Sequence, residues 1–253
     1  MKNDNDLPAG AGSNFIEQTK YHNLLVSDQL RGYPAPPLQP AYDPALVQYR
    51  LPDPLAVAAG HKADVHQVIH ERSSIRSYRD KPVTDGMLSL MLWETQGVKK
   101  NIRNIHTLRT VPSAGARHAL ETWLLINRVE GITPGLYRYL PLIHSLLQAS
   151  LAEEISGRLT RACLDQQMVR KSAATFFWTA EIYRMKWRYS ERAYRYIFLD
   201  AGHVCQNLYL SAQSMGCGVC AIAAFDDDLL NTALGIDGTS QFAIYAASCG
   251  LRI

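Results

Sequence analysis

The longest regular apolar pattern in this chain runs from Ser190 to Met215. Apolar residues recur there at helical spacing: Tyr194, Ile197, Phe198, Ala201, Val204, Cys205, Leu208, Leu210, Ala212 and Met215. A stripe this wide is typical of a helix buried in a core, not of one on a surface. Gly216 follows where a helix stop is expected. The rest of the fold must therefore pack around one central helix of about seven turns.

Shorter patterns on both sides of this segment mix helices with strands. Helices are predicted at 65–71, 86–97 and 151–164 and after Asp226, and strands at 121–129, 135–139, 173–182, 219–224 and 241–248. The strands are neither consecutive nor in strict alternation with crossover helices. We therefore expect an α+β fold, with a mostly antiparallel central sheet flanked by helices.

Residues 1–60 differ from the rest because seven prolines between Pro34 and Pro54 interrupt any periodicity. The one helical candidate in this region lies at 14–25. Prolines fix φ and remove backbone donors, so the segment is predicted to be an extended arm laid over a surface. The domain proper is expected at 61–253.

Charge and hydropathy exclude some classes of function. The net charge is only +3 and the 26 Lys and Arg residues are spread along the chain, which argues against a nucleic-acid partner. No apolar run reaches the length of a membrane span, and the N-terminus has no signal-like apolar region. We expect a cytoplasmic protein that binds no membrane.

The five cysteines are sparse and odd in number, which favours free thiols in a reducing compartment. Cys217 and Cys220 have the spacing of a redox or zinc half-site. No second Cys or His pair lies at metal-ligand spacing, so no metal is expected and the structural interpretation is favoured over a working pair.

Three stretches have the composition of a ligand site. In Arg72–Tyr78, an extended backbone would place Arg72, Ser74 and Arg76 on one face, and two guanidiniums with a hydroxyl suit a phosphate. A solvated basic turn is the alternative. Pro112–Arg117 and Gly216–Phe225 contain small residues that let a backbone approach a flat ligand closely. Neither contains a P-loop or a dinucleotide-binding glycine pattern.

These three stretches, taken in order, resemble the nitroreductase superfamily, and more narrowly the branch with the SagB-type azoline dehydrogenases. The segments 192–196 and 200–208 strengthen the resemblance, which covers roughly residues 20–253. It implies a homodimer in which each FMN site is built from both protomers. NADH or NADPH would donate electrons, and FMN would pass them to a small-molecule acceptor.

The resemblance also assigns residues to the flavin. Arg72, Ser73, Ser74 and Arg76 would hold the ribityl chain and phosphate, with Arg252 as a further phosphate contact. Pro112, Ser113, Ala114 and Gly115 would line the flavin from the other subunit. Ala223 and Ala224 would provide backbone contacts near the reactive edge of the ring.

Arg188 and Tyr189 stand where the azoline dehydrogenases have a Lys-Tyr pair that assists proton removal. Because Arg stays protonated near neutral pH, it cannot act as that base. A reductase of nitroaromatics or quinones is therefore favoured over an azoline dehydrogenase, with a flavin-binding protein without turnover as a third alternative. His118 and His203 are possible proton donors.

Overall fold

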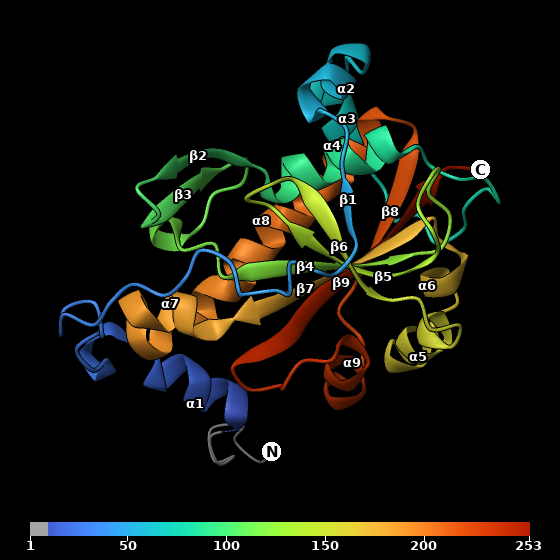
Figure 1. Ribbon diagram of the computed structural model, residues 1–253. Helices are drawn as coiled ribbons and strands as arrows, with labels where there is room; N and C mark the ends of the chain where they lie inside the picture. Colours follow the sequence, from blue (N-terminus) through green and yellow to red (C-terminus); the bar gives the residue numbers. More distant parts are fainter. Residues whose placement is uncertain (1–9) are drawn as a thin grey trace.

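The computed structural model describes residues 10–253, and its centre is a seven-stranded sheet (Figure 1). The strand order is β1-β6-β5-β4-β7-β9-β8, and every pair of neighbours runs antiparallel. The strands are β1 (Gln48–Arg50), β4 (Leu120–Ile126), β5 (Gly135–Leu140), β6 (Ser145–Ser150), β7 (Ala174–Glu181), β8 (Cys217–Ile222) and β9 (Gln241–Leu251). A separate hairpin joins β2 (Val98–Ile102) to β3 (His106–Arg109). The expectation of an α+β fold with an antiparallel sheet is confirmed.

Helices cover both faces of the sheet. They are α1 (Ala11–Gln18), α2 (Pro54–Gly60), α3 (Val65–Glu71), α4 (Asp85–Gln96), α5 (Ile155–Ala162), α6 (Met168–Lys171), α7 (Ile182–Tyr189), α8 (Ala193–Ser214) and α9 (Asp227–Leu234). One core cluster joins α4 and α8 to one face of the sheet, and a second joins α5, α6 and α9 to the other. The long helix expected from the sequence is α8, and it lies in the larger core.

Side-chain alternation along the central strands builds these two cores. In β7, Phe176 and Trp178 point to the α8 side, whereas Phe177 points to the α9 side. Continuous burial of such a strand requires apolar residues on both faces, which is what its sequence provides. The sheet is thus a rigid wall on which α8 and the loops around it are positioned.

The described part of the arm, residues 10–60, follows the surface of the domain. Gln29 N donates to the Trp187 carbonyl at 2.8 Å, and the Trp187 indole donates to the Tyr33 carbonyl at 2.9 Å. β1 adds an edge strand to β6, and α2 packs on α4. The division of the chain at residue 60 stays a prediction.

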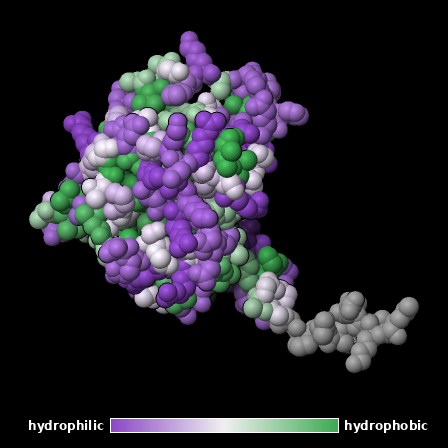
Figure 2. All heavy atoms as spheres, turned by 90° about the vertical axis from the view of Figure 1, so that its right-hand side faces the viewer, coloured by the Kyte–Doolittle hydropathy of each residue, from purple (hydrophilic) through white to green (hydrophobic). Residues whose placement is uncertain are grey.

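The surface near α5, α6 and the C-terminus is mostly hydrophilic, with small, separate apolar patches (Figure 2). Among residues 10–253, no helix has the length and apolarity that a membrane span needs.

Candidate functional site

The Arg72–Tyr78 segment is extended and lies against the ends of β8 and β9. Ser74 forms a parallel bridge with Val219, and Ile75 N donates to the Val219 carbonyl at 2.9 Å. A Cβ on Gly218 would lie 2.6 Å from the Ile75 Cβ, closer than side chains tolerate. Glycine at position 218 therefore allows the segment to approach the sheet.

Tyr78 fixes the other end of the segment. Its hydroxyl donates to the Ile75 carbonyl at 2.7 Å and lies 2.7 Å from Ser248 Oγ, and its ring packs where a Cβ on Gly250 would stand. Burial raises the pKa of Tyr78 far above its usual range, so the phenol stays protonated. The segment is held at both ends.

Arg72 and Ser74 converge on Tyr209 of α8. The Arg72 guanidinium carbon lies 5.1 Å from the centre of the Tyr209 ring, and Ser74 Oγ lies 3.0 Å from the Tyr209 hydroxyl. That hydroxyl also accepts a hydrogen bond from Ala221 N at 2.9 Å. Helix, sheet and extended segment therefore meet at a single phenol.

Arg252, near the C-terminus, contacts the next turn of α8. Its Nη1 donates to Gln213 Oε1 at 2.9 Å, and Gln213 lies about one helical turn beyond Tyr209. Within residues 10–253, neither Arg72 nor Arg252 forms an ion pair with a carboxylate. Guanidiniums without an ion pair, on neighbouring turns of one helix with a serine hydroxyl at the first of them, are donors of the kind that a phosphate group binds.

Ser73 and Arg76 have no side-chain hydrogen bond or ion pair with Arg72, Ser74, Tyr209 or Arg252 within residues 10–253. Both are exposed, and the positive charge of Arg76 acts instead on Cys220, where it opposes the increase in thiol pKa caused by burial. Arg72 and Ser74 thus meet at Tyr209, whereas the placement of Arg76 on the same face stays a prediction.

A cavity of about 560 Å³ lies further along α8 and is bordered by β9. Its walls include Phe198, Gly202, Ala223, Phe242 and Tyr245. Ala224 does not line the cavity, and its carbonyl accepts a hydrogen bond from Gln166 at 2.8 Å. Aromatic walls with a small residue between them suit a flat, apolar ring.

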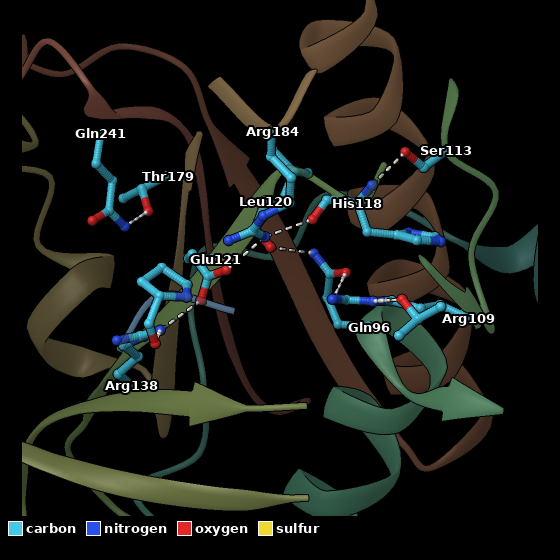
Figure 3. Close-up of polar contacts among 12 residues, drawn as sticks. Gln96, Arg109, Ser113, His118, Leu120, Glu121, Arg138, Thr179, Arg184 and Gln241 are labelled. Atoms are coloured by element: carbon cyan, nitrogen blue, oxygen red, sulfur yellow. Dashed lines mark hydrogen bonds and ion pairs between the residues drawn. The ribbon is translucent and has the colours of Figure 1, made fainter. Parts of the chain in front are cut away.

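The Pro112–Gly115 loop is bound to α8 through Asp200. Ser113 Oγ donates to Asp200 Oδ2 at 2.5 Å, and Ala114 N donates to Oδ1 at 3.2 Å. Ser113 Oγ also accepts from His118 N at 2.9 Å (Figure 3). Burial raises the pKa of Asp200, although the two hydrogen bonds oppose that increase. The loop has a defined shape before any ligand arrives.

The loop and the Arg72 cluster lie on opposite sides of α8. Asp200 binds the loop and Tyr209 binds Arg72 and Ser74. Nine positions at about 100° per residue place these two side chains about 180° apart around the helix axis. Phe198 and Gly202, which border the cavity, lie on the Tyr209 side. Within one chain the loop and the Arg72 cluster therefore lie across α8 from each other.

Arg188 and Tyr189, at the C-terminal end of α7, lie over the loop. A Cβ on Gly115 would stand 2.9 Å from Arg188 Nε and closer still to the Tyr189 hydroxyl. Gly115 has φ +57°, a left-handed conformation that glycine adopts without penalty. The Pro112–Gly115 loop and the Arg188–Tyr189 pair, which were predicted separately from the sequence, are therefore neighbours.

The two histidine candidates differ. Burial, followed by the charge of Arg109, lowers the pKa of His118 to about 3, so its ring is neutral and cannot act as an imidazolium donor near neutral pH. His203 lies on the exposed side of α8, which it shares with Leu199 and Gln206. Neither ring reaches the cavity wall.

A buried charge network supports the loop from the sheet side (Figure 3). Glu121 accepts from Arg184 Nη1 at 2.9 Å and from Arg138 Nη2 at 3.1 Å. Arg184 Nη1 also donates to the His118 carbonyl at 2.9 Å. Sequence reasoning missed this network, because Glu121 stands at the start of a strongly apolar strand and nothing local indicates which residues it pairs with.

The Cys217–Cys220 pair is not a working half-site. In β8 the two side chains point to opposite faces of the sheet, Cys217 into the α8 core and Cys220 into the α9 core. All five cysteines are buried and free of disulfides. The structural interpretation of the cysteines agrees with this geometry.

The model of the nitroreductase family matches residues 69–251. The chain belongs to the nitroreductase family. MJ1384 of Methanocaldococcus jannaschii, whose name places it among the nitroreductases, is 34% identical over 172 residues, which cover 68% of this chain and 84% of that protein. The match includes Arg72 and the residues that line the cavity, and Arg252 lies one residue beyond its end.

Two further proteins are similar to this chain over most of its length. The trifolitoxin-processing protein TfxB of Rhizobium leguminosarum bv. trifolii is 25% identical over 181 residues, 70% of this chain but only 48% of TfxB. A nitroreductase-family structure from Anabaena variabilis superposes with a TM-score of 0.69 at 28% identity, over 83% of this chain and 42% of that one. The TfxB similarity fits the SagB-type branch that the sequence resembles.

Proposed function

We propose that the protein is an FMN-dependent oxidoreductase that takes electrons from NADH or NADPH and reduces a small, electron-poor acceptor such as a nitroaromatic or a quinone. The observation that carries this proposal is the unpaired Arg72–Arg252 cluster on the same side of α8 as the aromatic cavity. Phe198 at the cavity and Tyr209 at the Arg72 cluster are eleven positions apart on α8, which at 1.5 Å per residue is about 16 Å along the helix axis. A phosphate at one end and a flat ring at the other are the features of a flavin mononucleotide.

The residues present fit this cofactor. Arg72 and Arg252 supply charged donors, Ser74 supplies a neutral one, and among the described residues neither guanidinium is in an ion pair, although the Glu71 carboxylate lies nearby and accepts from Gln213 Nε2 at 3.3 Å. Ala223 would meet the ring edge without steric hindrance. When bound, FMN supplies a centre that exchanges hydride and electrons. The chain binds, orients and shields that centre, and it contributes no nucleophile.

The site would be completed by a second copy of the chain. Since the Pro112–Gly115 loop lies on the far side of α8 from the cavity, it is available to a partner's flavin and not to its own. The α8 surface exposes Phe198 (53%), beside the cavity on the Tyr209 side, and Leu199 (60%), between the two sides, large apolar side chains that a partner would cover. These features support a homodimer with two shared sites.

A peptide azoline dehydrogenase is the second candidate, favoured by the similarity to the trifolitoxin-processing protein. Arg188, in place of a lysine that could lose its proton, counts against it. Tyr189 remains able to donate a proton.

One experiment separates these functions. The purified protein should be yellow, should bleach anaerobically with NADH or NADPH, and should regain its colour when a nitroaromatic is added. A protein that binds no FMN would contradict both enzyme functions. A yellow protein that neither nucleotide bleaches would instead favour azoline oxidation or a flavin protein without turnover.

A further inference from the structure

A cationic surface surrounds Gly115 at the tip of the flavin-lining loop. The side chains of Arg188 and Tyr189 lie so close to Gly115 Cα that no larger residue fits there without displacing them. Tyr189 is held in place by an edge-on contact with Tyr196, with ring centres 4.8 Å apart. Tyr196 in turn accepts a hydrogen bond from Arg192 Nε at 2.9 Å. The phenol and the guanidinium over the loop are therefore positioned by packing.

Arg117 adds a second positive charge beneath the same loop. Its side chain is buried, with 3% of its surface exposed, and its guanidinium carbon lies 5.0 Å from the centre of the Trp187 ring. Nη2 donates to the Ile105 carbonyl at 3.1 Å, while the buried Nε has no partner. Burial and the nearby charges of Arg188 and Arg184 lower the pKa of Arg117. Arg117 and Arg188 thus repel each other across the loop.

The carboxylates near the loop do not neutralise this charge. Three of them have other partners: Asp200 with Ser113 and Ala114, Glu121 with Arg138 and Arg184, Glu191 with Lys186. Over the described range, neither Arg117 nor Arg188 forms an ion pair. An excess of positive charge next to a buried guanidinium is unfavourable unless an anion binds there.

We propose that Arg188 and Tyr189, above Gly115, form an anion subsite that selects a second substrate carrying a carboxylate. This inference rests on the proposed function, because the loop would line the partner's flavin. The guanidinium offers parallel donors to both carboxylate oxygens, and the phenol offers a third donor. The preferred acceptor is then an electron-poor aromatic acid rather than a neutral nitroaromatic or quinone.

The FMN phosphate is not the anion in question. Its candidate site at Arg72 and Arg252 lies on the Tyr209 side of α8, whereas Gly115 belongs to the loop on the Asp200 side. A substitution at Arg188 should consequently affect aromatic acids much more than FMN. The two anions can be separated by experiment.

Binding is measured first, without turnover. Titration calorimetry of the FMN-loaded protein with benzoate should show saturable binding that Arg188→Gln weakens at least tenfold and Arg188→Lys weakens less. Arg170→Gln, which removes an exposed arginine from α6, is the matched control and should bind benzoate normally. FMN affinity, measured in parallel, should change less than threefold in Arg188→Gln.

Turnover gives the second readout. In the natural protein, kcat/KM for 4-nitrobenzoate should be at least ten times that for its methyl ester. In Arg188→Gln this ratio should fall towards one, mainly because the KM for the acid rises. Equal benzoate affinity in the natural protein and Arg188→Gln would overturn the subsite, even if the protein is yellow and reduces the ester. A protein without flavin would instead overturn the proposed function.

Discussion

The hydroxyls of Ser74 and Tyr209, 3.0 Å apart, join the extended Arg72–Tyr78 segment to the central helix. Because Tyr209 also binds the β8 backbone at Ala221, the position of the Arg72 guanidinium is set by the fold and not by the ligand. Preorganised donors of this kind bind a phosphate without the cost of ordering them first.

Arg72→Ala should weaken FMN binding at least tenfold. The substitution removes charged hydrogen bonds to phosphate, each worth roughly 1.5–3 kcal/mol. Equilibrium dialysis of FMN against the variant measures the effect. Arg79→Ala removes an exposed arginine directly after the Arg72–Tyr78 segment and should leave the affinity unchanged. Full flavin retention by Arg72→Ala on dilution would show that the phosphate lies elsewhere.

Glu121→Gln should lower the free energy of unfolding by about 3–5 kcal/mol, because it leaves Arg138 and Arg184 buried without a countercharge. Urea denaturation at pH 7 measures this loss. Asp80→Asn is the comparison, since it breaks an ion pair with Arg128 in which Asp80 is 92% exposed. Its expected cost is below about 1 kcal/mol. Similar losses in both variants would refute the role given to the buried network.

The stability of the protein should fall as pH decreases from about 6.5 to 4. Burial lowers the pKa of His144 to about 4, so the folded chain takes up its proton later than the unfolded chain. The contribution of the neutral His144 ring to stability is therefore fully present above the unfolded pKa of about 6.5, and it is lost as the pH falls towards 4. His144 Nε2 lies 2.7 Å from Ser89 Oγ, and its Nδ1 lies 2.7 Å from the Tyr139 hydroxyl.

His144→Asn provides the check on this pH dependence. Asparagine tolerates the left-handed φ of +50° at this position but does not titrate. The difference in unfolding free energy between pH 7 and pH 5 should be smaller in the variant, with His118 still contributing in the same direction. An identical difference would mean that His144 is not the titrating group.

Gly115→Ala should raise the KM for the acceptor, because the new methyl group displaces Arg188 and Tyr189. The backbone penalty of a left-handed alanine is about 1–2 kcal/mol. Gly235→Ala has the same penalty at φ +73° but meets only open space, so it separates strain from displacement. A KM that rises equally in both variants would argue against the contact.

The elements with strong periodicity could be predicted from the sequence. The helix predicted at 190–215 is α8, and the strand at 173–182 is β7. Weakly patterned elements were missed, among them α7, β6 and the β2–β3 hairpin. The charged Lys99 and Lys100 hide the alternation of β2, and Arg184 interrupts the apolar face of α7 although it is buried against Glu121.

The candidate site was predictable in its motifs but not in its geometry. Arg72, Ser74 and Ala223 could be named because small and basic residues cluster locally. Tyr209 and Gln213 could not, since they look like ordinary positions on a long helix and gain their role only from what packs against them. The spacing of Asp200 and Tyr209 predicts that they project from opposite sides of the helix, but their binding of the loop and of Ser74 is known only from the folded chain.

The most direct test of a flavin site shared between two chains is a mixed dimer. One chain carries Arg72→Ala, and the other carries Pro112→Trp, which places a bulky ring on the exposed start of the loop. Co-expression with two different tags isolates the mixed species, whose FMN content is measured at limiting FMN. If each site combines the Arg72 cluster of one chain with the loop of the other, the mixed dimer has one intact site and binds one FMN, whereas both parent dimers bind little. A mixed dimer as empty as its parents would contradict the shared site.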